Sequence, residues 1–248
     1  MAKKSGGWAE GLKTVLYAGL IAIGIRTVAF EPFNIPSGSM IPTLLVGDYL
    51  FVSKYSYGYS RYSLPFGSWL PSFGHGRIFG SLPQRGDVAV FKLPRDPSQD
   101  YIKRIVGLPG DRIQMKGGLL WINGAPVQRQ PEGNYVVEER DAPRMTVREY
   151  KETLPGGRSH DIIEQSDDGP LDNTQEYVVP PGNVFAMGDN RDNSLDSRVP
   201  SAVGFIPLEN LVGRAEFIFF SRDENTPLWQ VWNLPFAVRW DRLLDAVR

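Results

Sequence analysis

The segment 35–44, IPSGSMIPTL, places two serines, Ser37 and Ser39, on either side of one glycine and between two prolines. Proline is excluded from central strands, so this segment is expected to be irregular and rigid. Apolar residues surround the hydroxyl groups, which a simple surface turn does not require. The segment therefore predicts either a tightly packed turn or a serine nucleophile in a cleft.

A serine nucleophile needs a base, and the sequence restricts the choice. The two histidines, His75 and His160, stand in the sequences GHGR and RSHDI, which are typical of exposed loops, so a Ser-His-Asp triad is not expected. The patterns G-x-S-x-G, H-E-x-x-H and S-x-x-K are also absent. Lysine is the remaining candidate.

A lysine acts as a base only when burial lowers its pKa from about 10.4, because the charged ammonium group cannot accept a proton. Two lysines stand in apolar, strand-like sequence: Lys103 in YIKRIVGLPGD and Lys54 in LFVSKYSY. Strand alternation puts Tyr101, Lys103 and Ile105 on one face. Each lysine could equally be a surface residue whose stem covers apolar neighbours, so both remain candidates.

The segment 188–198, GDNRDNSLDSR, combines aspartates, arginines and serines. Its acidic spacing is similar to that of a calcium-binding loop, but the glycine and the terminal glutamate of the EF-hand pattern are missing. Interleaved Arg and Asp residues instead predict a network of ion pairs that holds the loop in one geometry. The hydroxyl groups of such a loop could then be directed at a neighbouring group.

The N-terminal region predicts a membrane anchor. Lysines precede an apolar run at 15–25, and the window 11–30 has 20 residues, about the length that spans a bilayer. Lys13 and Arg26 lie near its ends, where their charges can reach the interfaces. The sequence TVA at 27–29 is a weak cleavage site, so a cleaved signal peptide is the alternative. The lysines favour a cytoplasmic N-terminus, with residues 31–248 outside.

The remainder of the chain reads as short strands separated by turns. Asn123-Gly124, between two apolar runs, predicts a tight hairpin. From about 129 to 175 the sequence becomes polar and acidic, which indicates a solvated insertion or a small second lobe. Two aromatic-rich stretches, 55–80 and 228–248, are either ordered loops with partly buried rings or surfaces in the membrane interface.

Composition excludes several functions. The formal net charge of -1 and the pI near 6.2 give no electrostatic reason to expect nucleic acid as a partner. The chain has no cysteine, which excludes disulfides, thiolate metal sites and a cysteine nucleophile. With 26 glycines and 20 prolines, the sequence favours a turn-rich β protein over a helical bundle.

Three of these segments together resemble a known family. In this order after an N-terminal apolar run, PSGSMIPTL, YIKRIVGLPGD and GDNRDNSLDSR are similar to the signature segments of type I signal peptidases. These are membrane-bound bacterial serine proteases that remove signal peptides from exported preproteins. GDYLFVSKYSYG and RGDVAVFKLP match the segments between them. The resemblance covers about 33–110 and 182–198 and is weak between these ranges.

The resemblance implies a mainly β fold, in which an antiparallel β-sheet catalytic core is interrupted by a smaller lobe and preceded by one transmembrane helix. The expected division is a cytoplasmic N-terminus and anchor at 1–30, the first part of the core at 31–115, the inserted β lobe at 116–181, and the second part of the core with the aromatic C-terminal segment at 182–248. Some family members have two spans and a disulfide, whereas this sequence has one candidate span and no cysteine.

By matching positions, the resemblance makes Ser39 the nucleophile and Lys103 the general base. Ser37 and the Ser39 backbone N–H would bind the developing oxyanion, and Ser194 would orient the lysine amine. The residues that would brace the site by ion pairing are Arg104, Asp189, Arg191, Asp196 and Arg198. The residues that would line the substrate pockets are Phe33, Ile35, Met40, Leu44, Tyr101 and Ile102.

The same resemblance implies partners and a location. The expected substrates are preproteins with small residues at positions -1 and -3 before the cut, and no metal or cofactor is required. The expected location is the inner (cytoplasmic) membrane, in contact with lipid, with the catalytic domain on the periplasmic or extracytoplasmic side. The alternatives are a mitochondrial-type inner-membrane processing peptidase with the same Ser-Lys dyad and a non-catalytic, membrane-tethered β-domain. The sequence indicates no oligomeric state.

Overall fold

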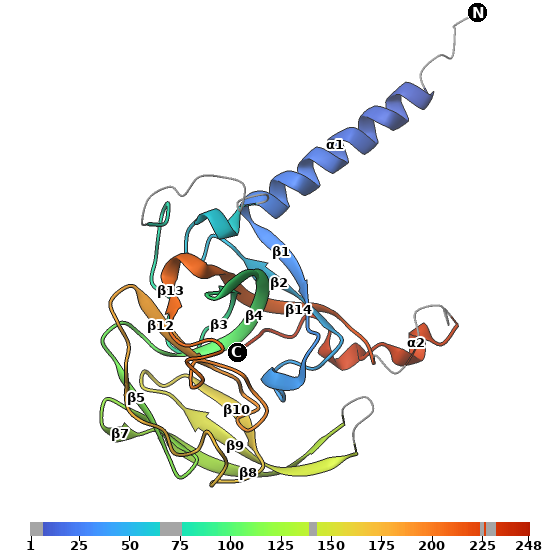
Figure 1. Cartoon of the computed structure of the whole chain (residues 1–248). Helices are drawn as coiled ribbons and strands as arrows, with labels where there is room; N and C mark the ends of the chain where they lie inside the picture. Colours follow the sequence, from blue (N-terminus) through green and yellow to red (C-terminus); the bar gives the residue numbers. More distant parts are fainter. Residues whose placement is uncertain (1–6, 65–75, 139–142, 224–225, 227–231) are drawn as a thin grey trace, which may run out of the picture.

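A computed structural model describes residues 7–64, 76–138, 143–223, 226 and 232–248. The N-terminal helix α1 (Gly7–Val28) extends away from the β-rich body of the molecule (Figure 1). Its window Glu10–Val28 has a mean hydropathy of 1.4 and is not buried, so it is long and apolar enough to cross a membrane. The predicted apolar anchor is therefore one continuous, exposed helix.

The chain passes directly from α1 into the sheet. Strand β1 (Phe30–Asn34) follows the helix at once and contains Pro32, which has no N–H to donate to a neighbouring strand. β1 pairs with β2 (Asp48–Ser53) and forms one edge of its sheet, where proline is tolerated. The base of the anchor is thus fixed to the edge of the body.

The body is built on a seven-stranded antiparallel sheet with the order β1-β2-β14-β3-β4-β12-β13. Within β3, Val88 and Val90 belong to one buried cluster, whereas Ala89 and Phe91 belong to another. Both faces of the central strands are therefore covered, and the predicted antiparallel β core is confirmed. The other strands of this sheet are β3 (Val88–Leu93), β4 (Asp96–Gly107), β12 (Asn183–Met187), β13 (Ile206–Pro207) and β14 (Leu211–Ser221).

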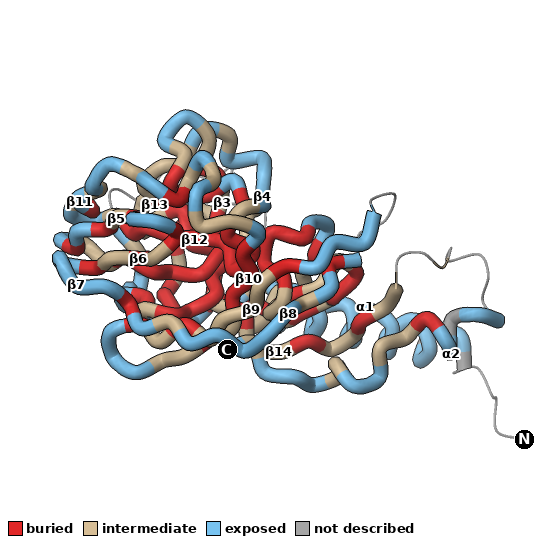
Figure 2. The backbone as a smooth tube through the Cα atoms, turned by 90° about the horizontal axis from the view of Figure 1, so that it is seen from below, coloured by how far each residue is buried: buried red, intermediate tan, exposed pale blue. Residues whose placement is uncertain are grey.

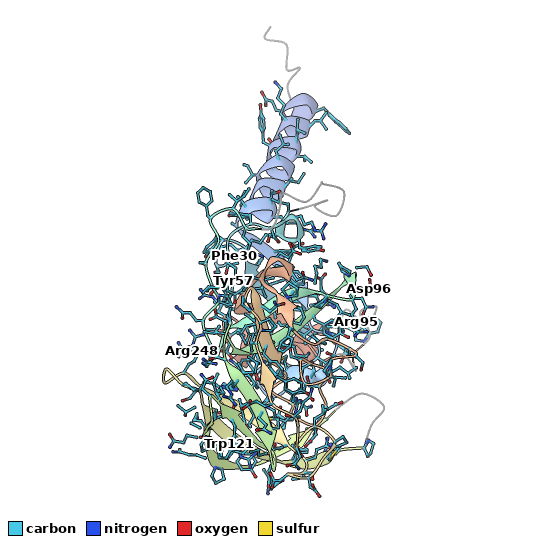
Figure 3. The ribbon with its side chains drawn as sticks, turned by 60° about the vertical axis from the view of Figure 1, so that its left-hand side comes forward. Phe30, Tyr57, Arg95, Asp96, Trp121 and Arg248 are labelled. Carbon is cyan, nitrogen blue, oxygen red and sulfur yellow. The ribbon has the colours of Figure 1, made fainter. Side chains whose placement is uncertain are left out.

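Two smaller antiparallel sheets come from the chain between the adjacent strands β4 and β12, with the orders β11-β5-β6-β7 and β10-β9-β8. Figure 1 shows β8, β9 and β10 at the end of the body opposite α1. Figure 3 places Phe30 at the base of α1 and Trp121, on β6, near that opposite end. The strands are β5 (Arg112–Lys116), β6 (Leu119–Ile122), β7 (Ala125–Pro126), β8 (Gln128–Val137), β9 (Met145–Thr153), β10 (Ser159–Glu164) and β11 (Tyr177–Val178).

Two predictions for this region can be compared with the structure. The hairpin predicted at Asn123-Gly124 joins β6 to β7, and both turn residues have positive φ angles, 54° and 79°, as a type I′ turn requires. The polar stretch 129–175 contains β8, β9 and β10, which bury a small cluster that includes Val137 and Val147. A sheet that is buried on one face needs few apolar residues, which explains its solvated appearance in sequence. The domain boundaries stay a prediction.

The main core lies in the middle of the body (Figure 2). One of its clusters contains Ile35, Met40 and Leu44, the apolar residues that flank Ser39 in sequence. Their burial fixes the serine segment to the sheet. The short helices are η1 (Gly38–Met40), η2 (Arg61–Ser63), η4 (Leu208–Asn210), α2 (Leu234–Ala237) and η5 (Trp240–Arg242).

The two aromatic-rich stretches are described only in part, because residues 65–75 and 227–231 lie outside the described ranges. In the C-terminal stretch, the side chains of Trp232 and Trp240 are each 64% exposed. In the first stretch, Tyr57 is buried, whereas Phe79 is almost fully exposed. The rings are thus not uniformly buried, and their contact with a membrane interface stays a prediction.

Candidate active site

Ser39 lies in the short helix η1, within the loop that joins β1 to β2. The base of this loop is closed by two backbone hydrogen bonds, from Ile35 N–H to Asp48 O at 2.9 Å and from Gly47 N–H to Ile35 O at 3.0 Å. Ser39 is only 8% exposed. The segment is irregular and held at its base, as its sequence predicted.

Lys103, on β4, contacts Ser39 directly. Its Nζ donates hydrogen bonds to Ser39 Oγ at 2.7 Å and to the Ile102 carbonyl oxygen at 2.9 Å, and the lysine is 4% exposed. Lys54, the other candidate, is also buried, but its Nζ lies 2.8 Å from Glu31 Oε2 in an ion pair. The structure therefore brings Lys103, and not Lys54, to the serine.

The charge state of Lys103 suits a base. Burial lowers the pKa of the Lys103 amine to about 8, although the carboxylates of Asp196 and Asp189 act in the opposite direction. An amine with this pKa is partly neutral near pH 7 and can accept a proton. The contact between Lys103 and Ser39 thus has the distance that a nucleophile and its general base require, and the lowered pKa makes part of the amine neutral near pH 7.

The two side chains line a cleft of about 830 Å³. Ser37 lines the same cleft, is exposed, and has its Oγ 3.4 Å from Ser39 Oγ. Tyr101 and Ile102 of β4 also line it. The Ser37 hydroxyl is therefore near the position where the attacking oxygen would meet a substrate carbonyl group.

The other residues predicted to contact substrate lie elsewhere. Phe33 lines a second cleft of about 790 Å³ beside the end of α1. Ile35, Met40 and Leu44 are at most 2% exposed and belong to the core beneath the serine segment. These three side chains are buried by packing against the sheet and support the serine segment from below. Their contact with substrate stays a prediction.

Ser194 lines the cleft and is 7% exposed. It lies close enough to Asp196 to help lower the pKa of that carboxyl, yet its hydroxyl makes no well-formed hydrogen bond to a described residue. A Cβ added to Gly188 would lie 2.3 Å from Ser194 Oγ and 2.5 Å from the Ser39 carbonyl oxygen. Glycine at 188 is therefore needed for this close approach, a role that sequence reasoning missed.

Buried ion pairs hold the loop 188–198. Arg104 donates to Asp189 through two hydrogen bonds of 2.8 and 2.7 Å, and Arg198 donates to Asp196 through two of 2.9 Å. All four side chains are at most 2% exposed. Buried pairs of this kind add little net stability, but removing one partner costs about 3–5 kcal/mol, so they fix the geometry of the loop strongly.

Arg191 also lies in this network, but its partner comes from the inserted part of the chain. The Arg191 guanidinium donates to Glu152, on β9, at 2.8 and 2.6 Å. Glu152 was not among the predicted residues. Its sequence neighbours indicate only a polar strand, and the pairing depends on how the small sheet packs against the core.

Three further hydrogen bonds join the loop 188–198 to the serine segment. Asn190 donates from its backbone N–H to Ser39 O at 3.2 Å and from its side chain to Gly38 O at 3.1 Å. Thr43 Oγ1 donates to Asp189 Oδ2 at 2.6 Å. Sequence reasoning missed Thr43, and the pattern IPTL alone contains no signal that would have identified it.

The expectation of an exposed loop histidine is wrong for His160, while His75 lies outside the described residues. His160 is 4% exposed on β10, because the glycine turn before it pairs β10 with β9. Burial, with the positive charges of Arg104 and Arg191, lowers its pKa well below the usual range. His160 is therefore a neutral interior side chain, and its Nε2 lies 3.6 Å from Glu152 Oε2.

The acidic spacing of the loop 188–198 is similar to that of a calcium-binding loop. Among the residues that the structure describes, no group of three or more acidic or histidine side chains is arranged to hold a metal ion. The aspartates at 189 and 196 instead pair with arginines.

The sequence of this chain is similar to those of known proteins. A family model described as "Signal peptidase, peptidase S26" matches residues 8–220. Signal peptidase I of Rickettsia canadensis is 44% identical over 219 residues, which cover 86% of this chain and 80% of the relative. Signal peptidase I of Rickettsia conorii is 45% identical over 207 residues, with coverages of 81% and 75%.

A crystal structure of a signal peptidase I from Enterococcus faecalis is 27% identical and matches 54% of this chain and 97% of that chain. Its TM-score of 0.33 is too low to support an argument about the fold. The family model and the two Rickettsia relatives confirm the resemblance read from the three sequence segments, and the alternative of a non-catalytic β-domain is wrong. The chain therefore belongs to the signal peptidase family, peptidase S26, and is a serine endopeptidase.

Proposed function

We propose that this chain is a membrane-anchored signal peptidase that cleaves signal peptides from exported preproteins with Ser39 as nucleophile and Lys103 as general base. The observation that carries this proposal is the 2.7 Å contact between Lys103 Nζ and Ser39 Oγ in a nearly buried site. The lowered pKa of Lys103, about 8, supports it. The bacterial relatives favour this activity over a mitochondrial-type processing peptidase.

The reaction follows from these positions. The neutral Lys103 amine takes the proton of Ser39 Oγ as that oxygen attacks the carbonyl carbon of the scissile peptide bond. The Ser37 hydroxyl and the Ser39 N–H donate hydrogen bonds to the oxyanion, an effect worth about 3–4 kcal/mol in other proteases. The Lys103 ammonium then protonates the leaving amine, which leaves an ester between Ser39 and the signal peptide. Lys103 next activates a water molecule that hydrolyses the ester.

A preprotein would bind as an extended strand. Residues 100–104 of β4 pair with β3 on one side, whereas β12 pairs with β4 only from Arg104 to Gly107. The main chain around Tyr101 and Ile102 can therefore hydrogen-bond to a peptide that lies in the cleft. Tyr101 and Ile102 would then leave room for small side chains at positions -1 and -3, and Ser194 would orient the lysine amine.

The anchor sets the location. We infer that α1 spans the inner (cytoplasmic) membrane, with the N-terminus in the cytoplasm and the catalytic domain on the periplasmic or extracytoplasmic side. The unburied apolar window Glu10–Val28 and the lysines that precede it support this orientation. We infer a division into an anchor at 1–30, a core at 31–115 and 182–248, and an inserted lobe at 116–181. The position of the strands β6 to β11 between the adjacent core strands β4 and β12 supports it, whereas β5 (Arg112–Lys116) crosses the first boundary of the lobe.

Cleavage assays with two variants test the proposal. Ser39→Ala and Lys103→Met, prepared as the full chain in detergent, should lose cleavage of a preprotein by about 1,000-fold or more while staying folded. Lys116→Met, which removes an exposed lysine on β5, is the matched control and should cleave normally. Cleavage at the normal rate by a folded Ser39→Ala or Lys103→Met variant would contradict the proposed dyad.

A further inference from the structure

The C-terminal segment 239–248 folds back onto the body of the molecule. Leu244 N–H donates to Ile218 O at 2.7 Å, and Val247 N–H donates to Glu216 O at 2.8 Å, so the segment runs beside β14. In Figure 1 the C-terminal end lies over the region of β4 and β14, and Figure 2 shows it at the surface beside β14. This position makes the segment a neighbour of the site, whereas its sequence predicted either an ordered loop with partly buried rings or a surface in the membrane interface.

Arg242 joins this segment to the loop that follows Ser39. Its guanidinium donates to Asp48 Oδ2 at 2.6 Å and to Asp48 Oδ1 at 3.2 Å, and also to the Thr43 carbonyl oxygen at 3.0 Å. Asp48 is fully buried and also accepts a hydrogen bond from Leu45 N–H at 2.8 Å. Arg242 therefore fixes the loop 41–48 at two points.

The last residues of the segment reach the other side of the site. The Arg248 carbonyl oxygen accepts a hydrogen bond of 2.9 Å from Arg104 Nη2, and Arg104 follows Lys103 on β4. Val247 packs against the buried cluster that contains Met40, the residue after Ser39. Figure 3 shows Arg248 against the body of the molecule. The segment thus touches both the serine loop and the lysine strand.

We propose that the segment 239–248 is a C-terminal clamp that positions Ser39 against Lys103, with Arg242 as its main positioning residue. The inference rests on the proposed function, because it assigns the segment to the geometry of the same dyad. Ser39 and Lys103 lie on separate elements, so their contact lasts only while the loop 41–48 keeps its place against β4. Arg242 holds that loop through Asp48 and the Thr43 carbonyl oxygen, and Val247 packs against the cluster that contains Met40.

A loosened clamp has a specific chemical consequence. Burial is the main cause of the low pKa of Lys103, so water that enters beside a displaced loop raises that pKa toward its ordinary value. A rise of about one unit reduces the neutral fraction of the amine at pH 7 about tenfold. A simple loss of folded protein would instead reduce the rate equally at every pH.

The test compares Arg242→Gln, Arg242→Lys and the control Arg112→Gln as full chains in detergent. Arg112 is an exposed residue that pairs with Glu176 outside the clamp. Arg242→Gln should lower kcat for preprotein cleavage at pH 7 about tenfold with little change in KM, and its rate should recover at higher pH. Arg242→Lys should restore part of the rate, and Arg112→Gln should match the unchanged protein.

A second readout needs no substrate. NMR titration of isotope-labelled lysine should show a higher Lys103 pKa in Arg242→Gln than in the unchanged protein. An unchanged pKa together with an unchanged kcat, or an equal loss of rate at every pH, would overturn the clamp. Failure of the unchanged protein to cleave would contradict the proposed function, while the pKa comparison would still decide on the clamp. If Arg242→Gln does not fold, Val247→Ala is judged by the same two results.

Discussion

Two opposing influences act on the amine of Lys103. Burial favours its neutral form, whereas the nearby carboxylates of Asp196 and Asp189 favour the charged form. Asp196 pairs with Arg198, and Asp189 pairs with Arg104. Each arginine offsets the negative charge of its carboxylate. The ion pairs therefore suit the proposed mechanism, because they allow buried aspartates to lie near a lysine that would act in its neutral form.

A stability measurement on Lys103→Met checks this balance. With a pKa of about 8 in the folded protein and 10.5 as the ordinary value, the charged amine costs the folded state up to about 3 kcal/mol. This cost is complete below pH 8, shrinks as the pH rises toward 10.5, and is absent above it. Lys103→Met should therefore be more stable than the unchanged protein at pH 7, with a smaller difference at pH 10.

Denaturant unfolding of both full-length proteins in the same detergent, at pH 7 and pH 10, gives the two differences. Lys116→Met, at an exposed position, is the control and should show no such dependence on pH. A Lys103→Met variant that is less stable at pH 7 and relatively more stable at pH 10 would contradict a Lys103 pKa that burial lowers.

At the residue scale, the family resemblance selects Ser39 and Lys103 as the proposed dyad because both lie in long, characteristic segments, whereas the residue pattern alone left Lys54 as an equal candidate. Thr43, Glu152 and His160 could not be found in this way. Glu152 contacts the site only because the β8-β9-β10 sheet packs against the loop 188–198, and His160 is buried by the same packing. Such contacts depend on distances across the fold, which one sequence does not encode in any local pattern.

At the scale of elements, the site is the junction of three pieces: η1, the strand β4 and the loop 188–198. The loop approaches the serine segment so closely that Asn190 N–H donates to Ser39 O at 3.2 Å. Gly188 allows this approach because a Cβ at that position would lie 2.5 Å from the same oxygen. The alignment of Ser39 therefore depends on a residue that carries no functional group.

Gly188→Ala should lower activity strongly. The added methyl group must displace either Ser194 or the Ser39 backbone, and a misplacement of about 1 Å can cost about 100-fold in rate. Gly76→Ala is the matched control, since a Cβ at that position meets nothing within 4 Å. The measurement is kcat for preprotein cleavage by the two folded variants. Equal rates for Gly188→Ala and Gly76→Ala would show that the close approach is unimportant.

Elements were predictable where local chemistry determines them. The Asn123-Gly124 turn requires positive φ angles, which these residues adopt readily, so its hairpin could be identified without tertiary information. The strand β9 could not be separated from a solvated loop in sequence, because most of its residues are polar and its order comes from pairing with β8 and β10. The clamp at 239–248 was also missed, because its position depends on hydrogen bonds to β14 and to Asp48, which lie far from it in sequence.

On the scale of the whole molecule, the end of α1 lies beside a second cleft that adjoins the cleft of Ser39. The second cleft is lined by Ile23 and Arg26 of α1 and by Phe33 of β1, and it shares Asp100 with the cleft that contains Ser39. The lobe of β8, β9 and β10 lies at the opposite end (Figure 1). The second cleft thus adjoins the cleft of Ser39 at Asp100.

The orientation of the anchor can be measured by cysteine labelling, because the chain has no cysteine of its own. Lys4→Cys places a thiol before the anchor, and Gln130→Cys places one on an exposed position of β8. In intact bacterial cells with a permeable outer membrane, a membrane-impermeant maleimide should label Gln130→Cys and leave Lys4→Cys unlabelled until the cells are lysed. Labelling of Lys4→Cys before lysis would contradict the proposed orientation.

The pH dependence of kcat/KM for preprotein cleavage tests the central claim most directly. If the neutral amine of Lys103 is the base, the rate constant should rise about tenfold per pH unit below about pH 8 and become constant above it. His160 does not contribute, since its pKa lies well below the usual range. A rate constant that is already constant at pH 6–7, with the protein folded throughout, would contradict the Ser39-Lys103 mechanism.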